Sequence, residues 1–175
     1  LKTQGELVSA KAAGDLLGSP IKGGGEWQIR GGAVGLGTLE LGTLTIPKVR
    51  QLLAAAGFKR PIPLDGSFRG EIVFSGALLK PGTLRARANL SDLTLSPQTG
   101  NDQLSSAVLQ ELTLRNNGPI VLEADEKGLH VVQAQLTGKD TNIQLSGNIA
   151  TSARNAWNIV LKGGLNLGIF QNYVP

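Results

Sequence analysis

Between residues 141 and 167, apolar side chains occupy every second position over two long runs. Ile143, Leu145 and Ile149 share one parity in the first run, and the second run begins at Trp157. The residues between them are mostly polar or small. Alternation with period two over this length is typical of antiparallel β-strands with one dry and one wet face. The pattern predicts a sheet with a single apolar face, and the function depends on what that face covers.

The same alternation recurs upstream, most regularly over residues 67–95 and 108–170. One pair of strands is expected on either side of a turn at 80–82. The sequence Asn-Asn-Gly-Pro at 116–119 predicts a hairpin turn, and residues 125–128 predict another. The polar stretch 96–106 is predicted to be a long loop.

An internal repeat links the two regular regions. GEIVFSG at 70–76 and TNIQLSG at 141–147 have the same form, and each is followed by a turn and a second alternating strand. Repetition of this kind favours an elongated architecture in which strands stack along one axis. At about 4.8 Å per strand, roughly twelve strands would extend for about 55 to 60 Å.

The first 46 residues alternate only weakly. Glycines interrupt them, notably at 23–25, and the parity slips at 40–42, where we expect a turn or a bulge. Residues 10–21 are consistent with a short helical turn or with an irregular crossing, and the pattern does not decide between them.

Residues 47–57 form the one convincing helix in the sequence. Val49, Leu52, Leu53 and Ala56 make an i, i+3, i+4, i+7 stripe, and proline at the start and glycine at the end suit the helix termini. One interpretation is a helix that covers an end or edge of the apolar face. The other is a movable lid.

Composition narrows the classes of function. The formal charge is +4, but the basic residues are scattered and the chain has only seven aromatic residues in all. This argues against a nucleic-acid partner, because such surfaces combine basic patches with stacking aromatic rings. The chain of 175 residues has no Met, no signal peptide and no long apolar run. We therefore expect a single segment, 1–175, from the interior of a longer protein.

The sequence offers little for catalysis. Without Cys there is no thiolate nucleophile and no common zinc site. The single histidine, His130, is expected to be a solvated strand residue, and the closest carboxylates, Glu123, Asp125 and Glu126, lie in a predicted turn. The Gly-rich stretch 31–42 continues as a strand and does not match a phosphate-binding loop. We expect no enzyme activity, no metal site and no cofactor.

The order of these segments resembles a known family. LSDLTLSP, then LTLRNNGPIVLEADEKGLHVVQAQLTGKDTNIQLSGNIA, then WNIVLKGGLNL, over about residues 67–170, is similar to the C-terminal regions of TamB-type proteins, within the AsmA-like group of bacterial envelope proteins. Residues 1–66 match this family less clearly.

The resemblance implies a long, curved, antiparallel sheet folded into a trough, the β-taco, in an otherwise all-β chain with one short helix. It also implies a periplasmic location, an inner-membrane anchor elsewhere in the full-length protein, and a barrel protein of the outer membrane as partner. Members of the family are implicated in moving phospholipid between the two membranes, and no catalytic residues belong to them.

The expected ligand is therefore phospholipid, held against the apolar face. Small residues on that face, such as Ala86, Ala88 and Gly147, leave room for an acyl chain or for close approach of a second sheet. The residues expected to line the groove are Phe68, Ile72, Phe74, Leu84, Ala86, Ala88, Leu90, Leu112, Leu114, Ile120, Leu122, Ile143, Leu145, Ile149, Trp157, Ile159, Leu161 and Leu165.

Two other functions stay open. One is a scaffold for assembling outer-membrane or secreted β-proteins, which would bind client strands at exposed sheet edges. The other is a closed β-sandwich with a structural or adhesive role. Exposed edges would also allow the fragment to pair with a second copy of itself.

Overall fold

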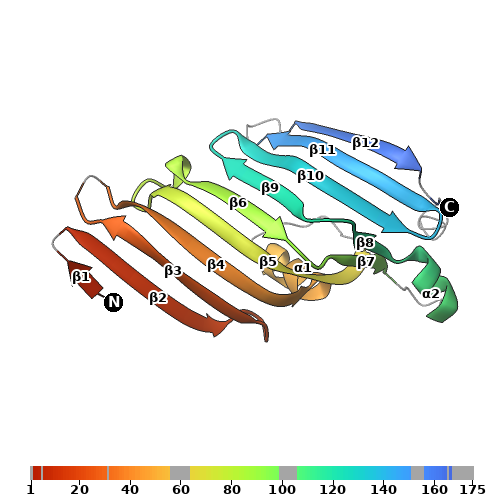
Figure 1. Ribbon diagram of the computed structural model, residues 1–175, viewed down its shortest axis with the longest axis horizontal. Helices are drawn as coiled ribbons and strands as arrows, with labels where there is room; N and C mark the ends of the chain where they lie inside the picture. Colours follow the sequence, from red (N-terminus) through yellow and green to blue (C-terminus); the bar gives the residue numbers. More distant parts are fainter. Residues whose placement is uncertain are drawn as a thin grey trace.

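The computed structural model describes residues 2–4, 6–30, 32–55, 64–98, 106–150, 156–164 and 166. Within these ranges, twelve strands form one antiparallel sheet with the main order β1-β2-β3-β4-β5-β6-β9-β10-β11-β12 (Figure 1). The prediction of an all-β fold built on a long antiparallel sheet is confirmed. That the sheet encloses an apolar interior stays a prediction.

Most strands are long enough to carry several residues on each face. Their bounds are β1 (Lys2–Gln4), β2 (Leu7–Asp15), β3 (Pro20–Gln28), β4 (Val34–Thr45), β5 (Leu64–Ala77), β6 (Arg85–Leu90), β7 (Thr94–Pro97), β8 (Leu114–Asn116), β9 (Ile120–Asp125), β10 (Gly128–Gly138), β11 (Thr141–Ala150) and β12 (Trp157–Gly164). A 3-10 turn, η1 (Pro81–Thr83), lies in the predicted turn between β5 and β6.

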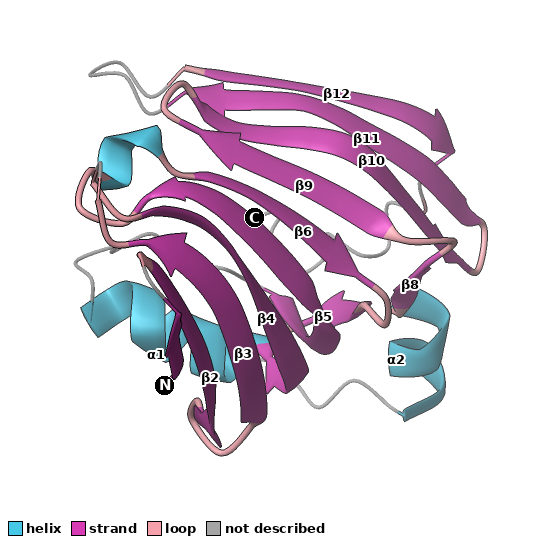
Figure 2. Ribbon diagram, turned by 60° about the vertical axis from the view of Figure 1, so that its left-hand side comes forward, coloured by secondary structure: helices cyan, strands magenta, loops and turns pink. Residues whose placement is uncertain are grey.

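Two helices accompany the sheet. The predicted helix is α1 (Ile46–Ala55), which contacts β4 and β5 and lies behind them in Figure 1. A second helix, α2 (Ser106–Leu112), lies beside β8 (Figure 2), so the prediction of a single helix was wrong. Seven residues are too few for a clear helical period. The i, i+4 pair Val108 and Leu112 nevertheless packs against apolar residues of the sheet.

The predicted hairpin at 116–119 is also wrong. Strands β8 and β9 both pair antiparallel with β10, so they run in the same direction and form one strand with a break. In the same way, β6 and β7 both pair antiparallel with β5, with a break at 91–93. The Asn-Gly-Pro sequence therefore interrupts a strand and does not reverse the chain.

Asn116 joins these two breaks. Its Oδ1 accepts a hydrogen bond from the backbone N–H of Leu93 at 2.8 Å, and its Nδ2 donates to the carbonyl oxygens of Ser91 at 2.6 Å and Gly118 at 2.7 Å. The backbone N–H of Asn116 also donates to the carbonyl of Leu93. One side chain thus satisfies backbone groups that the interrupted ladder leaves without partners.

The N-terminal region forms more regular strands than its weak sequence alternation predicts. Residues 10–21, which the pattern left undecided, belong to β2, a turn and the start of β3, and the glycines at 23–25 lie inside β3. The expected irregularity near 40–42 is present as a register shift between Leu41 and Leu44 in the β4–β5 pair.

The internal repeat has a counterpart in the backbone. Gly76 and Gly147, which end the two matching segments, have φ values of +130° and +131°. A Cβ atom on Gly76 would meet the backbone of Thr83 and Leu84, just before β6, and one on Gly147 would meet the backbone of Asn158 and Ile159 in β12. The Ser-Gly pair in each repeat therefore marks a conformation that only glycine adopts without strain.

The densest packing lies at the α2 end of the sheet. Leu112, Leu114, Ile120, Leu136 and Ile143 are all at most 8 % exposed and form one cluster with Ala134. Figure 2 shows the strands bowed along their length, with α1 behind the N-terminal strands. The well-packed core is therefore local, and much of the sheet is less deeply buried.

Candidate ligand-binding face

Cross-strand pairing aligns apolar residues and glycines across nine strands, from β2 to β12. Directly paired residues of an antiparallel sheet point to the same face. The first apolar ladder is Ala10, Gly25, Gly37, Phe74, Ala86, Ala124, Leu129, Ile149 and Trp157. The second is Ala12, Gly23, Leu39, Ile72, Ala88, Leu122, Val131, Gly147 and Ile159.

Neither apolar ladder contains a polar side chain. Eight steps between nine strands, at about 4.8 Å each, extend for roughly 38 Å. This is longer than one acyl chain of a phospholipid, because two such chains end to end span the hydrocarbon core of a bilayer, which is about 30 Å thick. The two apolar ladders therefore form a continuous strip across the sheet.

The opposite face is polar along the same path. In each strand, one residue lies between the two ladder residues and points to the opposite face. These residues form a third row of direct pairs: Lys11, Gly24, Thr38, Val73, Arg87, Glu123, His130, Asn148 and Asn158. Arg87 forms an ion pair with Glu123 at 2.6 Å. The sheet is thus two-sided, as the alternation predicts.

Two aromatic rings lie over glycines near the N-terminal end of the strip. Trp27 and Phe74 are stacked, with ring centroids 6.3 Å apart and an angle of 28° between the planes. A Cβ atom on Gly25 or Gly35 would clash with the ring of Trp27, and one on Gly37 would clash with that of Phe74. These glycines therefore make room for the protein's own aromatic rings.

At Gly25 and Gly35 a Cβ atom would meet the backbone of a neighbouring strand as well as the ring, whereas at Gly70, Gly147 and Gly163 the backbone alone lies in the way. Gly147 and Gly163 also have positive φ. We interpreted small residues here as space for an acyl chain or for a second sheet. At these three positions the structure instead attributes glycine to backbone conformation and close strand approach.

The C-terminal end of the strip is the most open part. Trp157 is 60 % exposed, Ile159 39 % and Leu161 49 %, and all three are among the residues expected to line the groove. They lie on β12, which among the described residues pairs on one side only, with β11. By contrast, Ile143 on β11 is 5 % exposed.

Most of the predicted groove residues lie on this one face. Direct cross-strand pairs join fourteen of them to the strip or to adjoining rows on the same face. They are Phe68, Ile72, Phe74, Ala86, Ala88, Leu90, Ile120, Leu122, Ile143, Leu145, Ile149, Trp157, Ile159 and Leu161. Leu84 lies just before β6, and Leu114 is in β8. Leu112 was placed wrongly on a strand, because it ends α2. Leu165 lies outside the described residues.

The helix stripe is only partly covered. Val49 and Leu53 are half-buried, and Leu52 is 40 % exposed. Whether the helix covers an edge of the apolar face or moves as a lid stays a prediction. Ala56 lies outside the described residues. Arg50 joins the helix to β5, since its guanidinium donates hydrogen bonds to Asp65 Oδ1 and to Gln98 Oε1, both at 2.8 Å.

Several residues of the strip were missed by sequence reasoning. Ala10, Ala12, Gly23 and Gly25 lie in strands rich in small residues, where alternation of size and polarity is weak. The signal that could have found them is the pairing through β4 to β5, because Ile72 and Phe74 on β5 alternate clearly and select the face.

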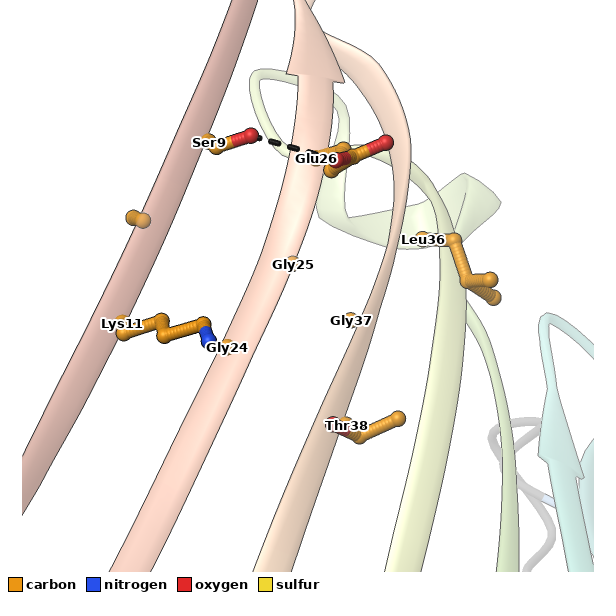
Figure 3. A pocket seen from close by; sticks show the side chains of 9 residues that line it. Ser9, Lys11, Gly24, Gly25, Glu26, Leu36, Gly37 and Thr38 are labelled. Carbon is orange, nitrogen blue, oxygen red and sulfur yellow. Dashed lines mark hydrogen bonds between the residues drawn. The ribbon is translucent and has the colours of Figure 1, made fainter. Parts of the chain in front are cut away.

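A hollow of about 370 Å³ lies on the polar face (Figure 3). Its walls include Ser9, Lys11 and Glu26, and its floor includes Gly24, which carries no side chain. Ser9 Oγ donates a hydrogen bond to Glu26 Oε1 at 3.2 Å. Leu36 and Thr38 of β4 also line it, so the hollow combines polar and apolar groups and lies on the side of the sheet away from the apolar strip.

His130 is half-buried on the polar face, where its Nε2 lies 3.4 Å from Asp125 Oδ1. Hydrogen bonding from the backbone N–H of Lys127 is the main reason that the pKa of Asp125 lies below its ordinary value. Within the described ranges, no group of three or more metal-ligating side chains is placed to hold a metal ion.

No helix in the described part of the chain is both long and apolar enough to span a membrane. Comparisons of the chain with protein-family models, curated proteins and solved structures found no match.

Proposed function

We propose that this chain is a segment of a lipid conduit whose apolar strip shields phospholipid acyl chains between the inner and outer membranes of a bacterial envelope. The observation that carries the proposal is the pair of uninterrupted apolar ladders from β2 to β12. The resemblance of residues 67–170 to TamB-type proteins supports it. In this proposal the full-length protein is anchored in the inner membrane and acts with a barrel protein of the outer membrane.

The energetics favour a continuous strip. Moving an acyl tail of about sixteen methylenes into water costs on the order of 10 kcal/mol, at about 0.8 kcal/mol per methylene. A surface that remains apolar over the whole path keeps the tail from becoming fully wet at any stage. A polar interruption would restore part of this barrier.

The proposal is tested in the full-length protein. A charged substitution at Phe74, Leu145 or Ile159 introduces an ion where the tail would lie, so phospholipid transport should fall sharply. Normal transport, with the variant protein present at normal levels, would contradict the proposal.

The exposed edge strand β12 favours one alternative, a scaffold for assembling outer-membrane or secreted β-proteins. Unpaired backbone groups at such an edge can bind a client strand by β-augmentation. The N–H of Leu161 points away from β11, because hydrogen-bonded and non-hydrogen-bonded pairs alternate from the pair Ala150–Ala156 onward. Proline at position 161 removes this outward donor and should abolish client binding, while lipid binding by the rest of the apolar strip should survive.

A further inference from the structure

The strand β12 ends the sheet with an apolar and exposed edge. In the part of the chain that the structure describes, β12 pairs only with β11. Val160 is 42 % exposed on the polar face, and its neighbours Ile159 and Leu161 are 39 % and 49 % exposed on the other face. The strand has eight residues, contains no proline and carries one charged residue, Lys162. Long apolar edges of this kind are templates for pairing with another strand.

The opposite edge of the sheet differs from β12. There β1 has only three residues and pairs with only the first three residues of β2. The rest of β2 carries Lys11 and Asp15. Short strands and charges are the features that discourage edge pairing. Only one of the two edges is therefore suited to bind a further strand.

We propose that β12 binds β12 of a second copy of this chain, antiparallel, with Val160 of each copy directly opposite the other. In this register Ile159 faces Leu161 on the apolar side, and Asn158 faces Lys162 on the polar side. Trp157 then faces Gly163 of the second copy. The arrangement continues one sheet through both copies.

Self-complementarity selects this register. A shift by one residue would turn the apolar side of one copy to the polar side of the other. A shift by two residues would place Trp157 opposite Leu161, or beyond the end of β12. Only pairing centred on Val160 brings a tryptophan opposite a glycine at both ends of the contact.

The same pairing of tryptophan with glycine already exists within the chain. Trp27 on β3 is the direct partner of Gly35 on β4, and its ring occupies the space above that glycine. Trp157 is 60 % exposed, and its direct partner within the chain is Ile149, not a glycine. Gly163 of a second copy would give its ring a glycine to cover. Aromatic rings that cover cross-strand glycines stabilise sheets.

A contact centred on Val160 is isologous, because the same residues contribute from both sides. Since the β1 edge is unsuited to pairing, the contact closes after two copies and forms a dimer, not a filament. The apolar faces of the two copies join, because the ladders that end at Trp157 and Ile159 then meet the rows of Gly163–Ile143 and Leu161–Leu145 in the second copy. The dimer does not depend on the proposed lipid function.

Charge substitutions at the centre of the contact test the register. Val160→Lys places two like charges directly opposite each other, and so does Val160→Glu. For each variant alone, the dissociation constant of the dimer should be at least about tenfold higher than for wild type. An equimolar mixture of the two should recover the dimer, because a lysine then faces a glutamate. Sedimentation velocity over a concentration series measures each case.

Leu36→Lys is the matched control. Leu36 is 55 % exposed on the same polar face, but β4 is paired on both sides, so this variant should dimerise like wild type. Circular dichroism checks that every variant is folded. Three results would each overturn the proposal: wild type stays monomeric, the single variants dimerise normally, or the mixture stays monomeric. Wild type would stay monomeric if β12 binds a strand of another protein and not a second copy.

Discussion

Trp27 on β3 lies directly opposite Gly35 on β4, and its indole ring occupies the space that a side chain at position 35 would need. The ring also covers Gly25 on its own strand and stacks on Phe74 from β5. Three strands are thus joined on the apolar face by two rings lying over three glycines. The N-terminal part of the sheet, which is poor in large apolar residues, depends on this arrangement.

Gly35→Ala should therefore destabilise the protein. The added methyl group would clash with Trp27 and with the backbone carbonyl of Glu26, which predicts a loss of about 1 to 3 kcal/mol. Chemical denaturation measures the free energy of unfolding. Gly14→Ala is the control, because nothing lies within 4 Å of its Cβ position, and this variant should be nearly neutral. Equal effects of the two substitutions would be evidence against the Trp27 arrangement.

Asn116→Ala should cost about 2 to 3 kcal/mol of folding free energy. The substitution removes one acceptor and two donor interactions that satisfy backbone groups at Leu93, Ser91 and Gly118. Asn117→Ala is the matched control, since the neighbouring side chain is exposed and Asn117 binds Gln135 through its backbone. A denaturation midpoint that is the same for both variants would show that Asn116 does not join the two breaks.

Asp125→Asn should change how stability depends on pH. The pKa of Asp125 in the folded chain lies below its ordinary value of 3.8, mainly because its carboxylate accepts a hydrogen bond from the N–H of Lys127. The unfolded chain therefore takes up this proton first as the pH falls. The stabilisation is complete above 3.8 and is lost as the pH falls through the lower, folded pKa.

Thermal melting between pH 6 and pH 2 checks this dependence. The melting temperature of wild type should exceed that of Asp125→Asn at the upper end of this range, and the two should converge in acid. A difference that stays constant over the whole range would rule out the carboxylate as the titrating group.

Sequence periodicity predicted the sheet and much of the apolar face, because alternation is a local property. Phe74 and Leu145 could be assigned to one face from their own strands. The direction of the chain at Asn116 could not, because the same Asn-Gly sequence suits a hairpin turn and a strand break, and only pairing with β10 distinguishes them. Helix α2 is too short for a period to emerge. The exposure of Trp157 depends on what lies beyond β12, which no local pattern records.

The most direct test of the proposed function compares two neighbouring positions on β12. Ile159 and Val160 are 39 % and 42 % exposed, but they lie on opposite faces of the same edge strand. Aspartate at either position should disturb edge pairing similarly. A difference in bound phospholipid between the two variants therefore shows which face of the strand the lipid contacts. The measurement is the amount of phospholipid that remains bound to the chain after purification from bacterial cells, determined by native mass spectrometry. We expect bound phospholipid in wild type and in Val160→Asp, and about tenfold less in Ile159→Asp, where a charge enters the apolar strip. Absence of lipid from wild type, or equal lipid in all three proteins, would contradict the account.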